Sequence, residues 1–338
     1  MEQIAILSLL EFTAAQLEKF RSVSTRFVVE QLPEATIEAI PPWLRESVQV
    51  LYGWGDPLGE AHHFPRLRWV QTHSAGVDYL YDTPTWQSDI LISSLNGIHA
   101  TPMAEHALAM MLALRQRVPT MIRNQLQATW PSGRWEIFSR PELRGSILGI
   151  VGYGAVGREV ARLAKSFGMR ILAVNRSGER QPYRGYAEPG IGDPTATIPE
   201  AIFPSTALVN VLPDCDFVVL TAPLTAETHH IINVTTLTAM KPTAYLLNLG
   251  RGPLVDETAL IKALQQNSLA GAGLDVFETE PLPAESTLWQ LENVIISPHV
   301  SGFTPQYDER ASDLFAENLR RFLNGEPLIN LVVKERGY

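Results

Sequence analysis

The chain has 338 residues, of which 45% are hydrophobic and 19% charged, and its formal net charge is −9. This length favours two domains, because one hydrophobic core seldom serves so many residues, and the composition argues against long disorder. The negative balance disfavours a long nucleic-acid groove, and no stretch approaches the roughly 18 apolar residues of a membrane span. We therefore expect a cytoplasmic globular protein with neither nucleic-acid nor membrane partners.

The first hundred residues alternate short apolar runs with polar or helical segments. The runs IAILSLL, RFVVEQL, SVQVLYGW, LRWVQTHS and DILISSLN are typical of strands, and TAAQLEKFRSV is typical of a helix. This alternation predicts a parallel sheet with covering helices. A longer helix follows in TPMAEHALAMMLALRQRV, where we expect Thr101 to be the N-cap and Pro102 the first helical residue. Residues 125–146 carry Pro131 and Gly133, and we interpret them as an irregular connection.

A second alternating series begins near residue 147. SILGIVGYG, RILAVN, FVVLTAPL, AYLLNLG, AGLDVF and VIISP indicate strands, while AVGREVARLAKSFG and DETALIKALQQ indicate helices. An amphipathic helix ended by Gly325 closes the chain. Residues 178–208 are rich in Pro and Gly and lack periodicity, so they form an unusually long loop to which the sequence assigns no role. We expect an α/β protein with two doubly wound parallel-sheet domains.

Cys215 is the single cysteine and stands at the start of an apolar strand run. It has no partner for an intrachain disulfide and no neighbouring ligand residues, so we expect a buried, inert thiol and no metal site.

The glycine loop GIVGYGAVG places Gly152, Gly154 and Gly157 between a strand and a helix. In this context the pattern predicts a dinucleotide site: the first glycine permits a tight turn, the second admits the pyrophosphate, and the third lets helix and strand pack. The helix N-terminus then directs free N–H groups at the phosphates.

The next strand ends at Asn175, about where an acidic residue would bind the adenosine ribose. Asn175 is neutral, Arg176 offers a bidentate fork to a 2′-phosphate, and Ser177 offers a hydroxyl. We therefore favour NADP over NAD. The alternative is that Arg176 points to solvent and stacks on adenine.

Polar side chains follow several strands of the second series. In parallel α/β sheets, ligands bind beyond the carboxyl ends of the strands, and Arg251, Asp275 and His299 stand at such ends. This set suits hydride transfer to a 2-oxo acid: Arg251 binds the carboxylate, His299 supplies the proton, and a carboxylate such as Glu280 fixes the imidazole tautomer. Asp275 would contact the nicotinamide.

With these residues in hand, the chain resembles the D-isomer-specific 2-hydroxyacid dehydrogenase family. The similarity runs from residues 72–80 (THSAGVDYL) to 316–323 (AENLRRFL) and is strongest in residues 248–260, 271–283 and 293–304. The resemblance implies a Rossmann domain, residues 99–301, inserted into a flavodoxin-like substrate domain, residues 1–98 plus 302–338. It also implies a homodimer formed through the cofactor domain.

The same resemblance assigns roles to individual positions. The catalytic set is Arg251, Glu280 and His299, with Glu280 rather than Glu278 as the family's glutamate. Backbone N–H groups around Ala75 and Gly76 meet the substrate carboxylate, and Arg251 and His299 also bind the substrate. The cofactor-contact positions are Gly152, Gly154, Ala155, Val156, Gly157, Asn175, Arg176, Ser177, Pro223, Leu249, Gly250, Asp275, His299 and Gly302.

We expect an NAD(P)-dependent reductase of small 2-oxo acids that forms the D-alcohol, with glyoxylate or hydroxypyruvate favoured because Asn175 resembles the NADP-using reductases. Glu280 stands where the formate-oxidising branch has Gln, which argues against that activity. Two alternatives stay open: a phosphoglycerate dehydrogenase, and a dinucleotide-sensing binding protein similar to the C-terminal-binding-protein corepressors, which keep the same triad.

Overall fold

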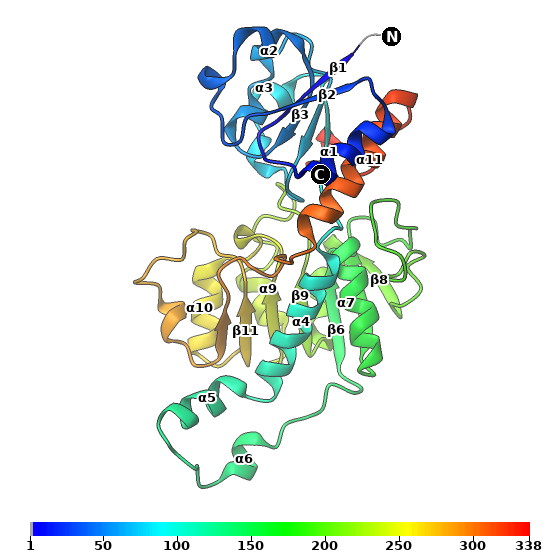
Figure 1. Ribbon diagram of the computed structural model, residues 1–338. Coiled ribbons are helices and arrows are strands. Elements are labelled where there is room, and N and C mark those ends of the chain that lie inside the picture. The colour runs from blue at the N-terminus through cyan, green and yellow to red at the C-terminus, as the bar shows by residue number, and fades with distance from the viewer. Residues whose placement is uncertain (1–2) are drawn as a thin grey trace. The chain divides into compact units, whose positions relative to one another are not determined.

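The computed structural model describes residues 3–338 and divides into two units, each built on a parallel sheet (Figure 1). Unit 1 comprises residues 3–98, Arg184–Glu188 and Thr304–Tyr338, and unit 2 comprises His99–Tyr183 and Pro189–Phe303. Residues 1 and 2 of the expected substrate domain lie outside the described residues. The predicted fold class, two parallel-sheet α/β domains, is confirmed.

Unit 1 has a five-stranded sheet in the order β2-β1-β3-β4-β5, all parallel. The strands are β1 (Ile4–Ser8), β2 (Phe27–Gln31), β3 (Val48–Gly53), β4 (Trp69–Thr72) and β5 (Leu91–Ser93). One face packs against α1 (Ala14–Val23) and α11 (Tyr307–Asn324), whose Phe20 and Phe315 meet edge to face. The other face is covered by α2 (Pro42–Ser47) and α3 (Pro84–Gln87). Burial of both faces explains why these strands read as continuous apolar runs.

Unit 2 has a seven-stranded parallel sheet in the order β12-β11-β10-β9-β6-β7-β8. Its strands are β6 (Ile147–Val151), β7 (Arg170–Asn175), β8 (Ala201–Pro204), β9 (Phe217–Leu220), β10 (Tyr245–Asn248), β11 (Gly271–Leu274) and β12 (Val294–Ile296). The order reverses between β6 and β9. In open α/β sheets, ligands bind at such a switch point.

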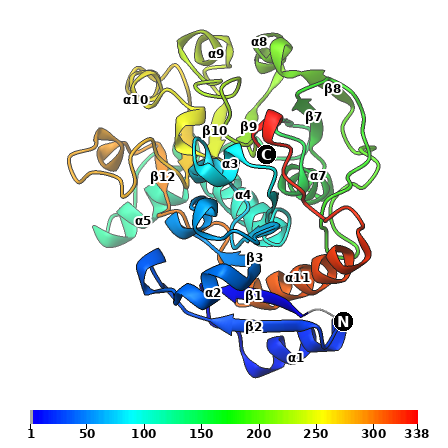
Figure 2. The same ribbon diagram turned by 90° about the horizontal axis from the view of Figure 1, so that it is seen from above.

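Side chains alternate between the two faces of this sheet, and each face has its own core. Phe217 and Val219 pack with α4 (Ala100–Arg115) and α7 (Ala155–Ser166). Val218 and Leu220 pack with α8 (Leu208–Val211), α9 (Val234–Ala239) and α10 (Glu257–Gln265). Figure 2 shows α9 and α10 on the opposite side of β9 and β10 from α4.

Three details of the sequence interpretation were wrong. The helix expected to start at Pro102 begins at Ala100 with His99 as its N-cap, so Thr101 is not the cap. Residues 125–146 are not wholly irregular, because α5 (Val118–Leu126) runs into them and α6 (Arg134–Phe138) lies within them. Neither helix has a buried residue, so neither shows the stripe that marks a core helix. The long loop contains β8, an edge strand of only four residues.

Cys215 is fully buried, as expected, and it packs beneath the strand glycine Gly149, whose Cβ would lie 2.6 Å from Sγ. Burial raises the pKa of the Cys215 thiol to about 12. Among residues 3–338, no helix is both long and apolar enough to cross a membrane.

Candidate active site

The glycine loop joins β6 to α7 and has the shape that a dinucleotide pyrophosphate requires. Gly152 has φ of +97°, and a Cβ there would lie 2.4 Å from the Ala222 nitrogen. A Cβ on Gly157 would lie 2.3 Å from the Gly152 oxygen. At Gly154, the N-cap of α7, a Cβ would meet nothing within 4 Å, so the backbone faces open space. The predicted tasks of the three glycines therefore fit the structure.

The N-terminus of α7 supplies donors beside this space. Ala155, Val156 and Gly157 are its first residues, and the first turn of a helix has no intrahelical acceptors for its N–H groups. The helix dipole adds a partial positive charge at the same end. The loop thus fits a diphosphate anion.

The end of β7 carries Asn175, Arg176 and Ser177. The Asn175 side chain is engaged locally: Oδ1 accepts from the backbone nitrogens of Ser177 at 3.1 Å and Gly178 at 2.7 Å, and Nδ2 donates to the Glu179 oxygen at 2.9 Å. Arg176 and Ser177 are exposed. The pKa of Glu227 is lowered by the Thr225 hydroxyl, by its own backbone N–H and by the charge of Arg176. The charge of Arg176 is therefore felt by a carboxyl group in the loop that follows β9.

Glu280 and His299 form the central pair of the site. Glu280 Oε2 lies 2.7 Å from His299 Nδ1, and Glu280 Oε1 accepts from the Phe277 nitrogen at 3.0 Å. A carboxylate only accepts, so Nδ1 carries the proton of this bond and Nε2 stays available. The side chains are 50% and 36% exposed, for His299 and Glu280 respectively, so solvent reaches both. Glu278, the sequence alternative, instead pairs with His230 at 2.8 Å.

The backbone of His299 lies in the left-handed region, with φ of +53°, which is uncommon for a residue other than glycine. Asp275, at the end of β11, holds this conformation. Its backbone oxygen accepts from the His299 nitrogen at 2.9 Å, and its carboxylate accepts from the nitrogens of Val300 and Ser301, each at 3.0 Å. Strained backbone of this kind persists only where the surroundings fix it.

The Asp275 carboxylate is fully buried and also accepts from the Ser297 hydroxyl at 2.5 Å. Burial alone would raise its pKa, but the hydrogen bonds from Ser297, Ser301 and Val300 outweigh it and lower the pKa. Ser297 Oγ also lies 3.0 Å from Nε2 of His106 on α4. Sequence reasoning missed His106 and Ser297, since no motif links residues so far apart. The nicotinamide contact of Asp275 stays a prediction.

Arg251 lies on the turn after β10, and Asn248 shapes that turn. Asn248 Nδ2 donates to the Arg251 oxygen at 2.8 Å, and Asn248 Oδ1 accepts from the Gly250 nitrogen at 3.2 Å. The half-buried Arg251 donates from Nη1 to the Gly250 oxygen at 2.9 Å. Asn248 is a third residue that sequence reasoning missed, because it stands inside a strand run.

The remaining expected contact residues fall at several places. Leu249 is buried and donates its N–H to the Leu220 oxygen at 3.1 Å, and Pro223 is exposed after β9. Gly302 lies beside His99, because a Cβ added to Gly302 would lie 3.6 Å from the His99 Cβ. Ala75 and Gly76 belong to unit 1, in the loop after β4, where the Ser74 hydroxyl donates to the Gly76 oxygen at 2.8 Å. Arg251, Glu280 and His299 belong to unit 2.

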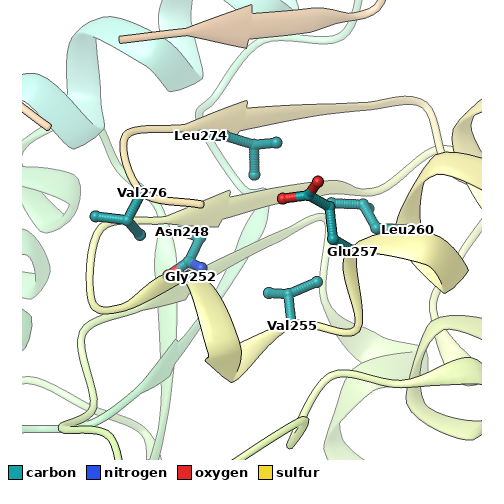
Figure 3. A pocket seen from close by; sticks show the side chains of 7 residues that line it. All are labelled: Asn248, Gly252, Val255, Glu257, Leu260, Leu274 and Val276. Atoms are coloured by element: carbon teal, nitrogen blue, oxygen red, sulfur yellow. The ribbon is translucent and has the colours of Figure 1, made fainter. Parts of the chain in front are cut away.

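Two other features resemble sites but lie apart from this chemistry. Figure 3 shows a pocket whose lining includes Val255, Glu257 and Leu274; Arg251, Glu280 and His299 are not among its lining residues. In unit 1, Glu60, His62 and His63 bring ligand atoms within 4.8 Å of one another. Glu60 already faces His62 at 3.4 Å, and we assign no metal role to this exposed group.

Comparison with known proteins agrees with this geometry. Residues 108–301 match the family model described as D-isomer specific 2-hydroxyacid dehydrogenase, NAD binding domain. A glyoxylate reductase from Pyrococcus furiosus is 38% identical over 277 residues, covering 80% of this chain and 77% of the relative.

Solved structures extend the likeness to the whole chain. A D-isomer specific 2-hydroxyacid dehydrogenase from Xanthobacter autotrophicus, in complex with NADPH and MES, has a TM-score of 0.81 at 27% identity and 100% coverage of both chains. A D-lactate dehydrogenase from Aquifex aeolicus, complexed with NAD and lactic acid, has a TM-score of 0.73 at 26% identity, covering 97% of this chain and 99% of the other. The protein is thus an oxidoreductase that acts on CH–OH donors and has an NAD(P)-binding domain. It belongs to the D-isomer-specific 2-hydroxyacid dehydrogenase family.

Proposed function

We propose that the protein reduces a small 2-oxo acid, glyoxylate or hydroxypyruvate, to its 2-hydroxy acid with NADPH as the reductant, and that it forms the D-isomer where the product is chiral. The observation that carries the proposal is the 2.7 Å contact between Glu280 and His299, on a backbone that Asp275 holds in the left-handed region. A histidine paired in this way with a carboxylate suits proton donation to a carbonyl oxygen. The glyoxylate reductases at up to 38% identity support the substrate.

When bound, the reduced nicotinamide supplies a hydride to the carbonyl carbon of the substrate. His299 delivers the proton that the carbonyl oxygen then requires, from Nε2, and keeps its Nδ1 proton in the bond to Glu280. Glu280 stabilises the imidazolium before this transfer and fixes the ring orientation throughout. Arg251 binds the substrate carboxylate with its planar guanidinium. Hydride and proton together complete the conversion of the carbonyl group to the alcohol.

The preference for NADPH rests on the residues at the end of β7. Position 175 carries an amide that is engaged by the loop backbone, so the strand end itself has no carboxylate to repel a 2′-phosphate. Arg176 and Ser177 are exposed and fit that group. One solved relative is in complex with NADPH and another with NAD, so the proposal of NADPH rests on these side chains and not on the fold.

We further propose a homodimer through unit 2. The helices α5 and α6 have no buried residue, and the segment that they and their connection form exposes Leu126, Trp130 and Trp135 by 82%, 84% and 77%. Exposed apolar side chains gathered on one segment are typical of an interface. Light scattering should give twice the chain mass, and Leu126→Glu with Trp130→Glu should reduce it to the monomer. Cytoplasmic location stays a prediction from the sequence.

The function is tested by parallel kinetics with NADPH and NADH on glyoxylate, hydroxypyruvate and phosphohydroxypyruvate. We expect turnover with NADPH, and a loss of about 10²- to 10⁴-fold in kcat for His299→Ala with unchanged cofactor affinity. His62→Ala, an exposed histidine of unit 1, is the control and should retain full activity. A protein that binds cofactor but reduces none of the three acids would favour the dinucleotide-sensing alternative.

A further inference from the structure

The long loop that the sequence left without a role is tightly held. We call residues 181–198 the strap. The strap has no helix or strand, yet Asp193 and Ala196 within it are buried. The Tyr183 nitrogen donates to the Pro194 oxygen at 2.8 Å, which closes the strap on itself. These buried residues and this hydrogen bond distinguish the strap from an ordinary exposed surface loop.

One side of the strap is fastened to the glycine loop by Arg158, a residue of α7 that is only 6% exposed. Arg158 Nε donates to the Tyr153 oxygen at 3.1 Å, Nη2 donates to the Gln181 oxygen at 2.7 Å, and Nη1 donates to the Asp193 oxygen. Its guanidinium also lies 4.9 Å from the ring centre of Tyr153. One buried cation thus joins the middle residue of the Gly152–Gly154 turn to both arms of the strap.

Asp193 completes the fastening from the strap side. The Tyr153 hydroxyl donates to Asp193 Oδ2 at 2.7 Å, in a buried bond. The same carboxylate accepts from the backbone nitrogens of Thr197 and Ile198, each at 2.9 Å. Next to it, the Gly192 nitrogen donates to the buried Glu159 carboxylate at 2.6 Å. The backbone that flanks Gly154 is therefore fixed by charged groups that water does not reach.

The middle of the strap belongs to the other unit. Residues Arg184–Glu188 group with unit 1, although the residues on both sides group with unit 2. Within unit 1, Glu188 pairs with Arg310 of α11 at 2.8 Å, and the Tyr186 nitrogen donates to Asn330 Oδ1 at 3.1 Å. The Tyr186 ring packs on a buried cluster that includes Leu95, Ile98 and Leu314.

We propose that the strap is a positioning element for the cofactor: it holds the glycine loop of unit 2 in its phosphate-binding shape, and its anchor in unit 1 contributes to that hold. The inference rests on the proposed dinucleotide-dependent function. The anchor, Arg184–Glu188, begins one residue after Tyr183 and ends four residues before Gly192. Releasing it would therefore loosen both fastened arms of the strap through the chain itself. Arg158 bonds the loop backbone at the Tyr153 oxygen, and Asp193 bonds the Tyr153 hydroxyl, so we assign Tyr153, Arg158 and Asp193 as positioning residues.

The test uses three variants of the full-length protein. Tyr153→Phe removes only the hydroxyl that bonds Asp193, and Glu188→Gln removes only the charge at the unit 1 anchor. Glu317→Gln removes an ion pair of the same kind, from the same helix, that does not touch the strap. NADPH affinity is measured by fluorescence titration without substrate. Amide exchange over residues 149–160 and 181–198 is measured without cofactor.

We expect the dissociation constant for NADPH to rise about threefold to tenfold in Tyr153→Phe and about threefold in Glu188→Gln, and to stay unchanged in Glu317→Gln. Exchange over the strap and glycine loop should quicken in the first two variants only. At saturating NADPH, kcat of Glu188→Gln should match the wild type, which a general loss of structure would not allow.

Two results would overturn the proposal: wild-type affinity in Glu188→Gln, or unchanged exchange in Tyr153→Phe. If the wild type binds neither NADPH nor NADH, the proposed function fails, whereas the exchange measurement still decides on the strap because it needs no cofactor.

Discussion

Replacing Arg176 with alanine should weaken the binding of NADPH far more than that of NADH. Arg176 is exposed at the end of β7, and the internal bonds of this loop run through Asn175, not through Arg176. The substitution therefore removes one cation and leaves the loop conformation intact. NADPH and NADH differ only by the 2′-phosphate, so the difference between their responses isolates the contact with that group.

The magnitude follows from the contact that is lost. A hydrogen bond to a charged group contributes about 1.5–3 kcal/mol, and exposure to salt and water brings this pair to the lower end of that range. About 1.4 kcal/mol corresponds to a tenfold change in affinity. We therefore expect the dissociation constant for NADPH to rise about tenfold and that for NADH to change less than about twofold.

The assay is a fluorescence titration of each cofactor at two salt concentrations. Arg176→Lys serves as the matched variant: it keeps the charge but loses the planar fork, so it should fall between the wild type and alanine. Glu227→Gln removes a carboxylate whose pKa is lowered in part by the charge of Arg176, and it should tighten NADPH but not NADH. Equal effects of Arg176→Ala on both cofactors would refute a role for Arg176 in reading the 2′-phosphate and make NAD the better assignment.

Three further predictions concern titratable groups inside unit 2. Asp275→Asn should cost about 1.5–3 kcal/mol of stability at pH 7. Because the folded-state pKa of Asp275 is lowered, its contribution is present above the ordinary value near 4 and is lost as pH falls below it, so the melting temperatures of variant and wild type should converge as the solution is acidified. If they stay equally far apart, the ionised carboxylate is not what holds the His299 segment. Glu257→Gln should act in the opposite direction. Burial raises the pKa of Glu257, and the like charge of Glu278 raises it further, while a backbone hydrogen bond opposes them, so the wild type loses stability as pH rises. The melting temperature of the variant minus that of the wild type should therefore be larger at pH 8 than at pH 4. If the difference between the two melting temperatures does not change with pH, the raised pKa of Glu257 does not affect stability, and the prediction is wrong. Finally, the Cys215 thiol, with a pKa of about 12, should react with a disulfide reagent at pH 8 only at the rate of unfolding, and fully in guanidinium.

How much of the fold the sequence predicts depends on how much of each element is buried. The inner strands β6, β9 and β10 have both faces covered, so they stand out as unbroken apolar runs between turns. The edge strand β8 has no fully buried residue, and α5 and α6 face no core of this chain. Their sequences therefore lack the periodicity that burial imposes, and they were missed for that reason.

The site shows the same limit in another form. Arg251, Glu280 and His299 follow strand ends in ordered motifs, so one sequence was enough to select them. Their supports were not accessible in this way: His106 and Ser297 are 191 positions apart and meet only in the folded chain. Arg158 gave no signal at all, because an arginine within an amphipathic helix usually faces solvent.

Asp275 and Glu280 have different roles around His299, and the difference follows from how deeply each is buried. Asp275 is fully buried, and its negative charge is committed to Ser297, Val300 and Ser301, which holds the left-handed backbone of the histidine. Glu280 is open to solvent, and its charge is directed at the imidazole alone among side chains. Asp275 does not contact the imidazole, and Glu280 does not bond the backbone of residues 299–301. With Asp275 alone, the ring would be held without a carboxylate to stabilise its charge. With Glu280 alone, the charge would be stabilised on a ring whose backbone is not fixed. The sequence shows two carboxylates near one histidine, and it is their difference in burial that assigns each its part.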